Sequence, residues 1–129
     1  MKPSLGIRAL VADDDDAIRR ALTVNLTRAG FDVTAVDDGA SAIAAGEAAR
    51  FDMVLVDYNM KTVDGAEVVR YFKQRFGAEI YCAVLSGEDD DMTRQTCARA
   101  GVDEMFQKPI SPVDLRRRLT EAMQPRRSA

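Results

Sequence analysis

The chain has 129 residues, of which 47% are hydrophobic and 30% are charged, and its formal net charge is −3. This composition is typical of one soluble globular domain with a single core. The acidic balance argues against direct binding to nucleic acid, which needs a basic face. No apolar stretch reaches the roughly 20 residues of a membrane span, and no long apolar core near the N-terminus suggests a secretory signal, so we expect a cytoplasmic protein.

Five apolar runs, each followed by a helix-like pattern, predict strands near 7–12, 32–36, 52–57, 80–86 and 104–108. Apolar residues recur at helical spacing in three of the segments between or after these strands, and they mark the inward faces of three helices. These residues are Ile18, Leu22, Leu26 and Ala29, then Val68, Val69, Phe72 and Phe76, and last Leu115, Leu119, Ala122 and Met123. The alternation predicts an α/β fold, a parallel sheet with helices on both faces and right-handed crossovers.

Two further helices, near 39–48 and 89–100, have weaker apolar faces. In the second we expect only Met92, Cys97 and small residues to point inward, which is typical of a lightly anchored element. The last helix should begin after Ser111, with the serine as its cap. We therefore expect one domain over residues 1–124 and a frayed polar tail over 125–129.

The sequence has no histidine and two cysteines. The missing histidine excludes a Ser-His-Asp or Cys-His hydrolase and a histidine phosphodonor, but it leaves a phosphoacceptor possible. Cys82 falls in an apolar strand and Cys97 in an expected helix, so we interpret both as reduced core thiols.

Polar side chains follow four of the predicted strands: Asp13 and Asp14 the first, Asp57 the third, Ser86 the fourth and Lys108 the fifth. The carboxyl ends of parallel strands share one edge of a sheet, where ligands bind. The run 13–16 alone leaves a helix start and a site equally open, because one or two carboxylates satisfy a helix cap. The second acidic strand end, at Asp57, favours a site.

Carboxylates that converge raise one another's pKa, and a divalent cation relieves this repulsion. Mg²⁺ prefers oxygen ligands, whereas no histidine or cysteine lies near this edge to favour zinc. Lys108 would add a point charge and Ser86 a hydroxyl donor. This set suits phosphoryl transfer, with Asp57 as the nucleophile that forms an aspartyl phosphate.

Five segments, in this order and at this spacing, resemble the receiver domain of two-component response regulators of the single-domain, chemotaxis-regulator-like kind: 10–15, 54–60, 63–65, 85–87 and 108–109. The resemblance spans about residues 5–124. It implies a flavodoxin-like, doubly wound five-stranded parallel sheet of order 2-1-3-4-5 with five helices. It also implies a signalling switch rather than an enzyme.

The resemblance further implies that Asp57 accepts a phosphoryl group from a histidine kinase or a histidine phosphotransfer protein. Asp14, Asp57 and the carbonyl of Asn59 would bind Mg²⁺ directly, and Asp13 through a metal-bound water. Ser86 would hydrogen-bond a phosphoryl oxygen, and Lys108 would pair with the phosphoryl group.

The chain departs from the family's pattern at two positions. Lys61 stands where receivers commonly have proline, which predicts a looser loop, and Met105 stands where they carry the switch aromatic. Phe106 is adjacent but should point to the other face of the sheet. Glu88, like Asn59, occupies a position that tunes the lifetime of the aspartyl phosphate in the family.

For partners, we expect the kinase to dock on Ile18, Arg19, Leu22 and the loop after Lys108. On phosphorylation, Ser86 would move and pull the loop 86–91, so that the face 89–123 changes its partner, a downstream protein or a second copy of the chain. The chain is either a stand-alone regulator or part of a larger regulator or hybrid kinase.

Three alternatives remain at this point. A phosphatase of the haloacid-dehalogenase kind needs a second acid where this chain has Asn59. A flavodoxin-like FMN carrier would meet repulsion from the four aspartates of 13–16. A pseudo-receiver or phosphate sink would bind partners without the usual output switching.

Overall fold

The computed structural model describes residues 4–87 and 89–128, in which strands and helices alternate along the chain. The strands are β1 (Arg8–Ala12), β2 (Asp32–Val36), β3 (Met53–Asp57), β4 (Tyr81–Ser86) and β5 (Glu104–Gln107). The helices are α1 (Asp16–Arg28), α2 (Gly39–Ala48), α3 (Gly65–Phe76), α4 (Asp91–Ala100) and α5 (Pro112–Ser128). The predicted strands are confirmed to within one residue at each end.

The strands form one parallel sheet in the order β2-β1-β3-β4-β5, which confirms the expected topology. Ala12 at the end of β1 pairs with Val36 of β2 and Val56 of β3, and Asp57 pairs with Leu85 of β4. The strand order reverses between β1 and β3. Connections that leave such a point in opposite directions open a crevice at the carboxyl edge of the sheet.

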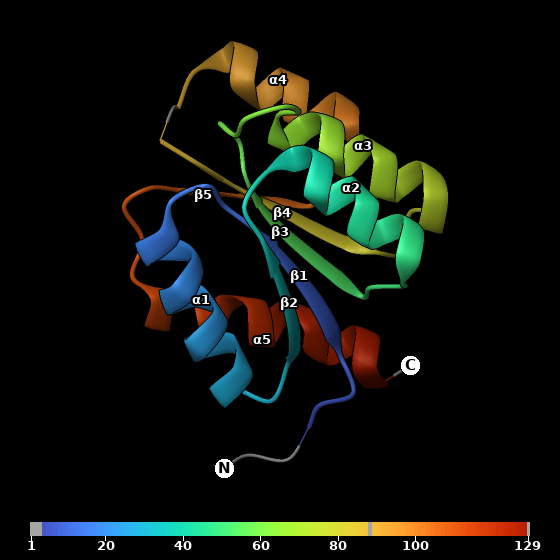
Figure 1. Cartoon of the computed structure of the whole chain (residues 1–129), viewed down its shortest axis with the longest axis vertical. Coiled ribbons are helices and arrows are strands. Elements are labelled where there is room, and N and C mark those ends of the chain that lie inside the picture. The colour runs from blue at the N-terminus through green and yellow to red at the C-terminus, as the bar shows by residue number, and fades with distance from the viewer. Residues whose placement is uncertain (1–3, 88, 129) are drawn as a thin grey trace.

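The helices cover both faces of the sheet, with α1 and α5 on one side and α2, α3 and α4 on the other (Figure 1). Successive residues of β1 feed these two cores in turn: Val11 packs on the side of α1 and α5, and Leu10 on the opposite side. Because the central strands β1 and β3 are covered on both faces, their apolar residues form continuous buried runs.

The long helices present the inward faces that their spacing predicts. Leu22 and Leu26 are buried in α1, and Val68, Val69 and Phe72 are buried in α3. Thus these two helices rest on large apolar side chains, and their positions above the sheet are firmly set.

Helix α4 turns few apolar residues toward the core, as expected, but one of the residues predicted to point inward is exposed. The buried residues are Thr93, Cys97 and Ala100, whereas Met92 is 77% exposed. The inward stripe advances by four and then three residues, and Met92 falls outside that spacing. The Cys97 prediction is confirmed, since its thiol is buried and free, and burial raises its pKa. The Cys82 thiol is likewise buried and forms no disulfide.

Helix α5 begins as expected and ends later. The Ser111 hydroxyl accepts a hydrogen bond from the backbone N–H of Asp114 at 3.0 Å, which makes it the cap. The helix continues to Ser128, four residues beyond the predicted end of the domain at 124. That the tail over 125–129 is frayed stays a prediction. Residue 129 lies outside the described chain.

Two neighbouring residues of β5 point to opposite faces of the sheet, as their alternation predicts. Phe106 is buried in the core beside α1 and α5, and Met105 packs against the core on the side of α4. The Arg118 guanidinium lies 4.6 Å from the centroid of the Phe106 ring.

Among the helices of the described chain, none is both long and apolar enough to cross a membrane.

Candidate functional site

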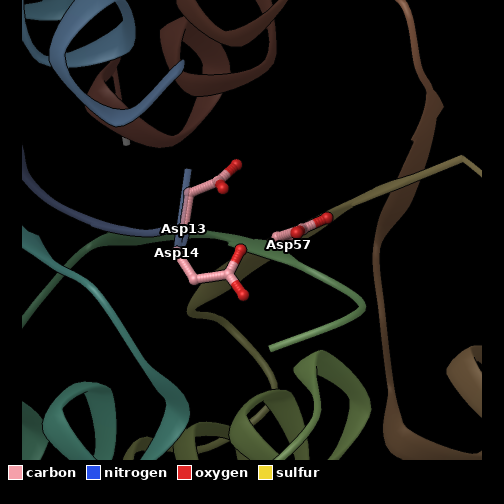
Figure 2. A group of neighbouring side chains, drawn as sticks. All are labelled: Asp13, Asp14 and Asp57. Carbon is pink, nitrogen blue, oxygen red and sulfur yellow. The ribbon is translucent and has the colours of Figure 1, made fainter. Parts of the chain in front are cut away.

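Three carboxylates meet at the carboxyl edge of the sheet. Asp13 and Asp14 follow β1 and Asp57 ends β3, and Figure 2 shows their side chains projecting from these neighbouring strand ends. Each offers a ligand oxygen, and these oxygens lie within 4.8 Å of one another. Asp13 is fully buried, Asp57 is 5% exposed and Asp14 is exposed. The predicted convergence of these three residues is therefore present in the structure.

Lys108 brings a positive charge to the same place. Its Nζ lies 2.9 Å from Asp57 Oδ1 and 3.8 Å from Asp13 Oδ2. The residue follows β5 directly, and its backbone N–H donates to the Ser86 carbonyl at 2.8 Å. This hydrogen bond ties the end of β5 to that of β4, so the lysine enters the site from a fixed backbone.

The electrostatics of the site are unbalanced. Burial raises the pKa of Asp13, and the nearby charge of Asp57 raises it further. Burial also raises the pKa of Asp57, although the hydrogen bond from Lys108 acts against this. For Lys108, burial alone would lower the pKa, but the hydrogen bond to Asp57 and the carboxylate charges raise it overall. Three carboxylates thus face one ammonium group.

One carboxylate oxygen in this cluster lacks a hydrogen-bond partner. Asp13 Oδ1 accepts from the backbone N–H of Asp15 at 2.9 Å, but the buried Asp13 Oδ2 accepts no hydrogen bond. A buried acceptor in that state costs free energy unless a cation or water meets it. Excess negative charge and a free oxygen both fit a divalent cation with oxygen ligands, as Mg²⁺ is.

The acidic run 13–16 divides between two tasks. Asp13 and Asp14 belong to the carboxylate cluster, whereas Asp15 is the N-cap of α1 and accepts from the N–H groups of Ala17 and Ile18 at 2.9 and 3.1 Å. The two interpretations of the run, helix start and site, therefore each apply to part of it.

The other predicted site residues lie at neighbouring strand ends. Ser86 is buried at the end of β4, one residue beyond Leu85, which pairs with Asp57. Asn59 is exposed in the loop after β3. Glu88 lies outside the described residues, so its predicted influence on phosphoryl lifetime stays a prediction.

The loop after β3, which carries Lys61 in place of proline, is bonded to the start of α2. The Lys61 carbonyl accepts from the Gly39 N–H at 3.3 Å, and Thr62 Oγ1 accepts from the Ala40 N–H at 2.9 Å. A side chain at Gly39 would clash with Val63, whose carbonyl oxygen lies 2.2 Å from the place of a Cβ atom. Close backbone contact thus holds this loop against α2.

Tyr58 extends the site toward α4, a contact that the sequence motifs did not indicate. Its N–H donates to the Leu85 carbonyl at 2.8 Å, and its side chain packs against the core on the side of α4. Burial raises the pKa of the Tyr58 hydroxyl and the charge of Asp64 adds to this, while a hydrogen bond with Thr96 of α4 opposes it. The residue after Asp57 therefore reaches α4 directly.

The structure corrects one part of the predicted docking surface. Leu22 is 3% exposed and packs in the core, so it is wrong as a residue that meets a kinase. Ile18 and Arg19 are partly exposed. Arg19 also makes a contact that the sequence reading missed, because its guanidinium donates to the backbone carbonyl of Asp13.

A doubly wound parallel sheet with carboxylates and a lysine at its switch point defines the class of this domain. Residues 9–120 match the family described as "Response regulator receiver domain", and the chain belongs to that family. The resemblance noted from the sequence is thereby confirmed.

Relatives and solved structures agree with this assignment. The chain is 34% identical to the transcriptional regulatory protein ResD of Bacillus subtilis over 105 residues, which are 81% of this chain and 43% of ResD. It is 32% identical to the DNA-binding response regulator MtrA of Mycolicibacterium smegmatis over 108 residues, 84% of this chain and 46% of MtrA. The chain thus spans about half the length of these curated relatives.

Two solved structures resemble the whole fold. The chemotaxis response regulator CheY4 of Vibrio cholerae superposes with a TM-score of 0.81 at 26% identity, over 93% of this chain and 98% of that one. The receiver domain of the sensor histidine kinase PA1611 from Pseudomonas aeruginosa gives 0.79 at 26% identity, over 90% and 96%. That receiver domain has a magnesium ion coordinated in its active site cleft.

Proposed function

We propose that this receiver domain is a phosphorylation-activated signalling switch whose phosphoacceptor is Asp57. The observation that carries the proposal is the setting of that carboxylate. Asp57 is nearly buried, it pairs with Lys108 at 2.9 Å, and its oxygen lies within 4.8 Å of ligand oxygens of Asp13 and Asp14. The phosphoryl donor is a phosphohistidine of a sensor histidine kinase or of a histidine phosphotransfer protein.

The transfer needs little more than positioning and charge compensation. An oxygen of Asp57 attacks phosphorus, a P–O bond forms, and the P–N bond of the phosphohistidine breaks with its electron pair returning to the imidazole nitrogen. Lys108 stays within reach of the acceptor oxygen and balances the charge that the phosphoryl group brings. Ser86, at the adjacent strand end, donates a hydrogen bond from its hydroxyl to a phosphoryl oxygen.

Asp13, Asp14, Asp57 and the backbone carbonyl of Asn59 would hold Mg²⁺ at this edge. The excess of carboxylates supports this assignment, and so does Asp13 Oδ2, which is buried without a hydrogen bond. So does the magnesium ion described in the related PA1611 receiver domain. When bound, Mg²⁺ supplies positive charge that neutralises the carboxylates and the transferring phosphoryl oxygens.

For output, we assign the surface of α4, β5 and α5, residues 89–123, to a downstream protein or a second copy of the chain. Strand β5 is the edge strand of the sheet and pairs with β4, whose last residue is Ser86. A phosphoryl group that recruits Ser86 biases the loop leading into α4, because that loop starts at the same residue. Met105 repacks in place of an aromatic switch residue.

The phosphoacceptor is tested by labelling the protein with acetyl phosphate and Mg²⁺ and weighing it by intact mass spectrometry. Wild type should gain one phosphoryl mass, and Asp57→Asn should gain none. Asp32→Asn is the matched control, because Asp32 is exposed at the start of β2, at the opposite edge of the sheet. If Asp57→Asn and Asp32→Asn are both labelled as fully as wild type, the assignment is contradicted.

The trigger is tested separately with Ser86→Ala. This variant should still take up label at Asp57, but hydrogen exchange in residues 89–100 should no longer change on phosphorylation. If Ser86→Ala shows the same exchange change as wild type, the hydroxyl is not the trigger, although Asp57 remains the acceptor.

A further inference from the structure

Arg19 spans the acidic loop at the start of α1. Its Nη1 donates to the backbone carbonyl of Asp13 at 2.9 Å, and its Nη2 donates to Asp16 Oδ1 at 2.6 Å. The side chain is 23% exposed. Since the two contacts lie three residues apart, one rigid guanidinium fork holds both ends of the loop 13–16.

The Asp13 carbonyl is a sensitive place to hold. It belongs to the same planar peptide unit as the N–H of Asp14, so its direction decides where the Asp14 side chain starts. The Asp13 N–H is already fixed, as it donates to the Val36 carbonyl at 3.2 Å, and Asp13 Oδ1 is fixed by the Asp15 N–H. Arg19 thus completes the restraint on the loop that carries two of the three clustered carboxylates.

We propose that Arg19 is a positioning residue for the metal site, which sets the geometry of Asp13 and Asp14 through the Asp13 carbonyl; this inference rests on the proposed function. The simpler alternative is an exposed Arg–Asp pair three residues apart on a helix, with no effect on the site. That pair accounts for the contact with Asp16. A surface ion pair does not explain the partly buried hydrogen bond from Arg19 to the Asp13 carbonyl.

Charge and positioning predict opposite results at this residue. A guanidinium beside a carboxylate cluster repels an incoming cation, so removing only its charge tightens Mg²⁺ binding. Removing its hold on the loop weakens binding, and residues that orient metal ligands are worth about 10-fold or more in affinity. Arg19→Lys keeps the positive charge but loses the guanidinium group that bonds Asp13 and Asp16 at the same time, whereas Arg19→Ala loses both the charge and these hydrogen bonds.

These variants have little reason to unfold. Arg19 lines an existing hollow of about 340 Å³ together with Ala35, Val36, Asp37 and Ser41. A shorter side chain enlarges that open hollow and leaves no sealed cavity. Thermal unfolding in EDTA checks this for each variant before metal is added.

The experiment is a Mg²⁺ titration by isothermal calorimetry of wild type, Arg19→Lys, Arg19→Ala, and the controls Arg20→Lys and Arg20→Ala. Arg20 is the next residue of the same helix and is exposed. We expect the dissociation constant to rise about 10-fold in both Arg19 variants and to stay near wild type in the Arg20 controls. Labelling of Arg19→Lys by acetyl phosphate should recover fully at saturating Mg²⁺, a shift in metal requirement that a general loss of structure does not produce.

Equal Mg²⁺ affinity in Arg19→Lys and wild type overturns the positioning role, and so does tighter binding by Arg19→Ala. No Mg²⁺ binding by wild type contradicts the metal site of the proposed function instead. The two failures are therefore distinguishable in one titration series.

Discussion

Two lysines meet carboxylates at opposite edges of the same sheet, and they are satisfied to different degrees. At the amino edge, Lys73 of α3 donates to the carbonyls of Ala78 and Ile80 at 3.0 and 2.6 Å and to Asp103 Oδ2 at 2.8 Å. At the carboxyl edge, Lys108 has one carboxylate oxygen at 2.9 Å and another at 3.8 Å. The first ammonium has an acceptor for each proton, while the second faces surplus negative charge.

The carboxylate partners differ in the same way. Asp103 Oδ2 also accepts from the Cys82 N–H at 2.8 Å, so it joins α3, β4 and the turn before β5. Asp13 Oδ2, by contrast, is buried without a hydrogen bond. A closed network stabilises the fold, whereas an incomplete one leaves room for a ligand. The comparison teaches that the carboxyl edge, unlike the amino edge, keeps a buried carboxylate oxygen without a hydrogen bond.

The backbone repeats this difference. At the amino edge, the turns after α1 and α4 place glycine in the left-handed region, Gly30 at φ 105° and Gly101 at φ 92°. At the carboxyl edge, the same region is occupied by Thr62, at φ 73°. A β-branched residue is strained there and glycine is not. Strain thus collects in the loop that follows β3.

The largest expected effect comes from breaking the closed network. Lys73→Met keeps the hydrophobic stem and removes the ammonium. The Asp103 carboxylate then loses its cation, and the two carbonyls lose this hydrogen-bond donor. With side-chain exposures of 13% and 28% for Lys73 and Asp103, we expect a loss of about 3 kcal/mol in the free energy of unfolding. Urea unfolding followed by circular dichroism measures it.

Arg70→Met, on the same helix, is the control. Its pair with Glu67 is exposed, with side-chain exposures of 43% and 57%, so the loss should stay below about 1 kcal/mol. Equal losses in the two variants would show that Lys73 is no more than another surface charge.

The opposite sign is expected at the carboxyl edge. Asp13→Asn removes a charge from the crowded cluster and keeps the oxygen that accepts from the Asp15 N–H. In EDTA at neutral pH, this variant should be more stable than wild type by about 1 kcal/mol. Added Mg²⁺ should then stabilise wild type more than the variant, because a ligand that binds only the folded state adds stability in proportion to its affinity.

The pH dependence checks the cause of that gain. Burial raises the pKa of Asp13 above its ordinary value of 3.8, so the folded protein binds more protons than the unfolded chain between 3.8 and the raised pKa. The contribution of Asp13 to stability therefore falls as pH rises through that window. The advantage of Asp13→Asn should be absent below pH 3.8, grow through the window and then level off. A pH-independent advantage would point to packing instead of charge.

The site was predictable from the sequence to the extent that it follows from strand ends. Apolar runs rich in β-branched residues locate β1 and β3, and the sharing of one edge by their carboxyl ends brings Asp13 and Asp57 together. Lys108 joins for the same reason, one residue beyond β5. None of this requires knowledge of side-chain conformation.

Main-chain acceptors were not predictable in this way. The hold of Arg19 on Asp13 and the carbonyl contacts of Lys73 end on backbone oxygens, which have no sequence signature. Met92 misled because the inward face of α4 is built from small residues, and a large apolar side chain beside them dominates the hydrophobic pattern. Burial of small residues has to be seen in the structure.

The smallest expected effect lies in the strained loop. Thr62→Asn replaces a β-branched residue at positive φ with one that tolerates this region, and its side-chain oxygen can still accept from the Ala40 N–H. We expect a gain of about 0.5 kcal/mol in the free energy of unfolding. Thr62→Val keeps the strain and loses the hydrogen bond, and should cost about 1 kcal/mol. If both variants are destabilised equally in urea, the hydrogen bond to α2 outweighs the strain, and the contrast between the two edges lies in their side chains alone.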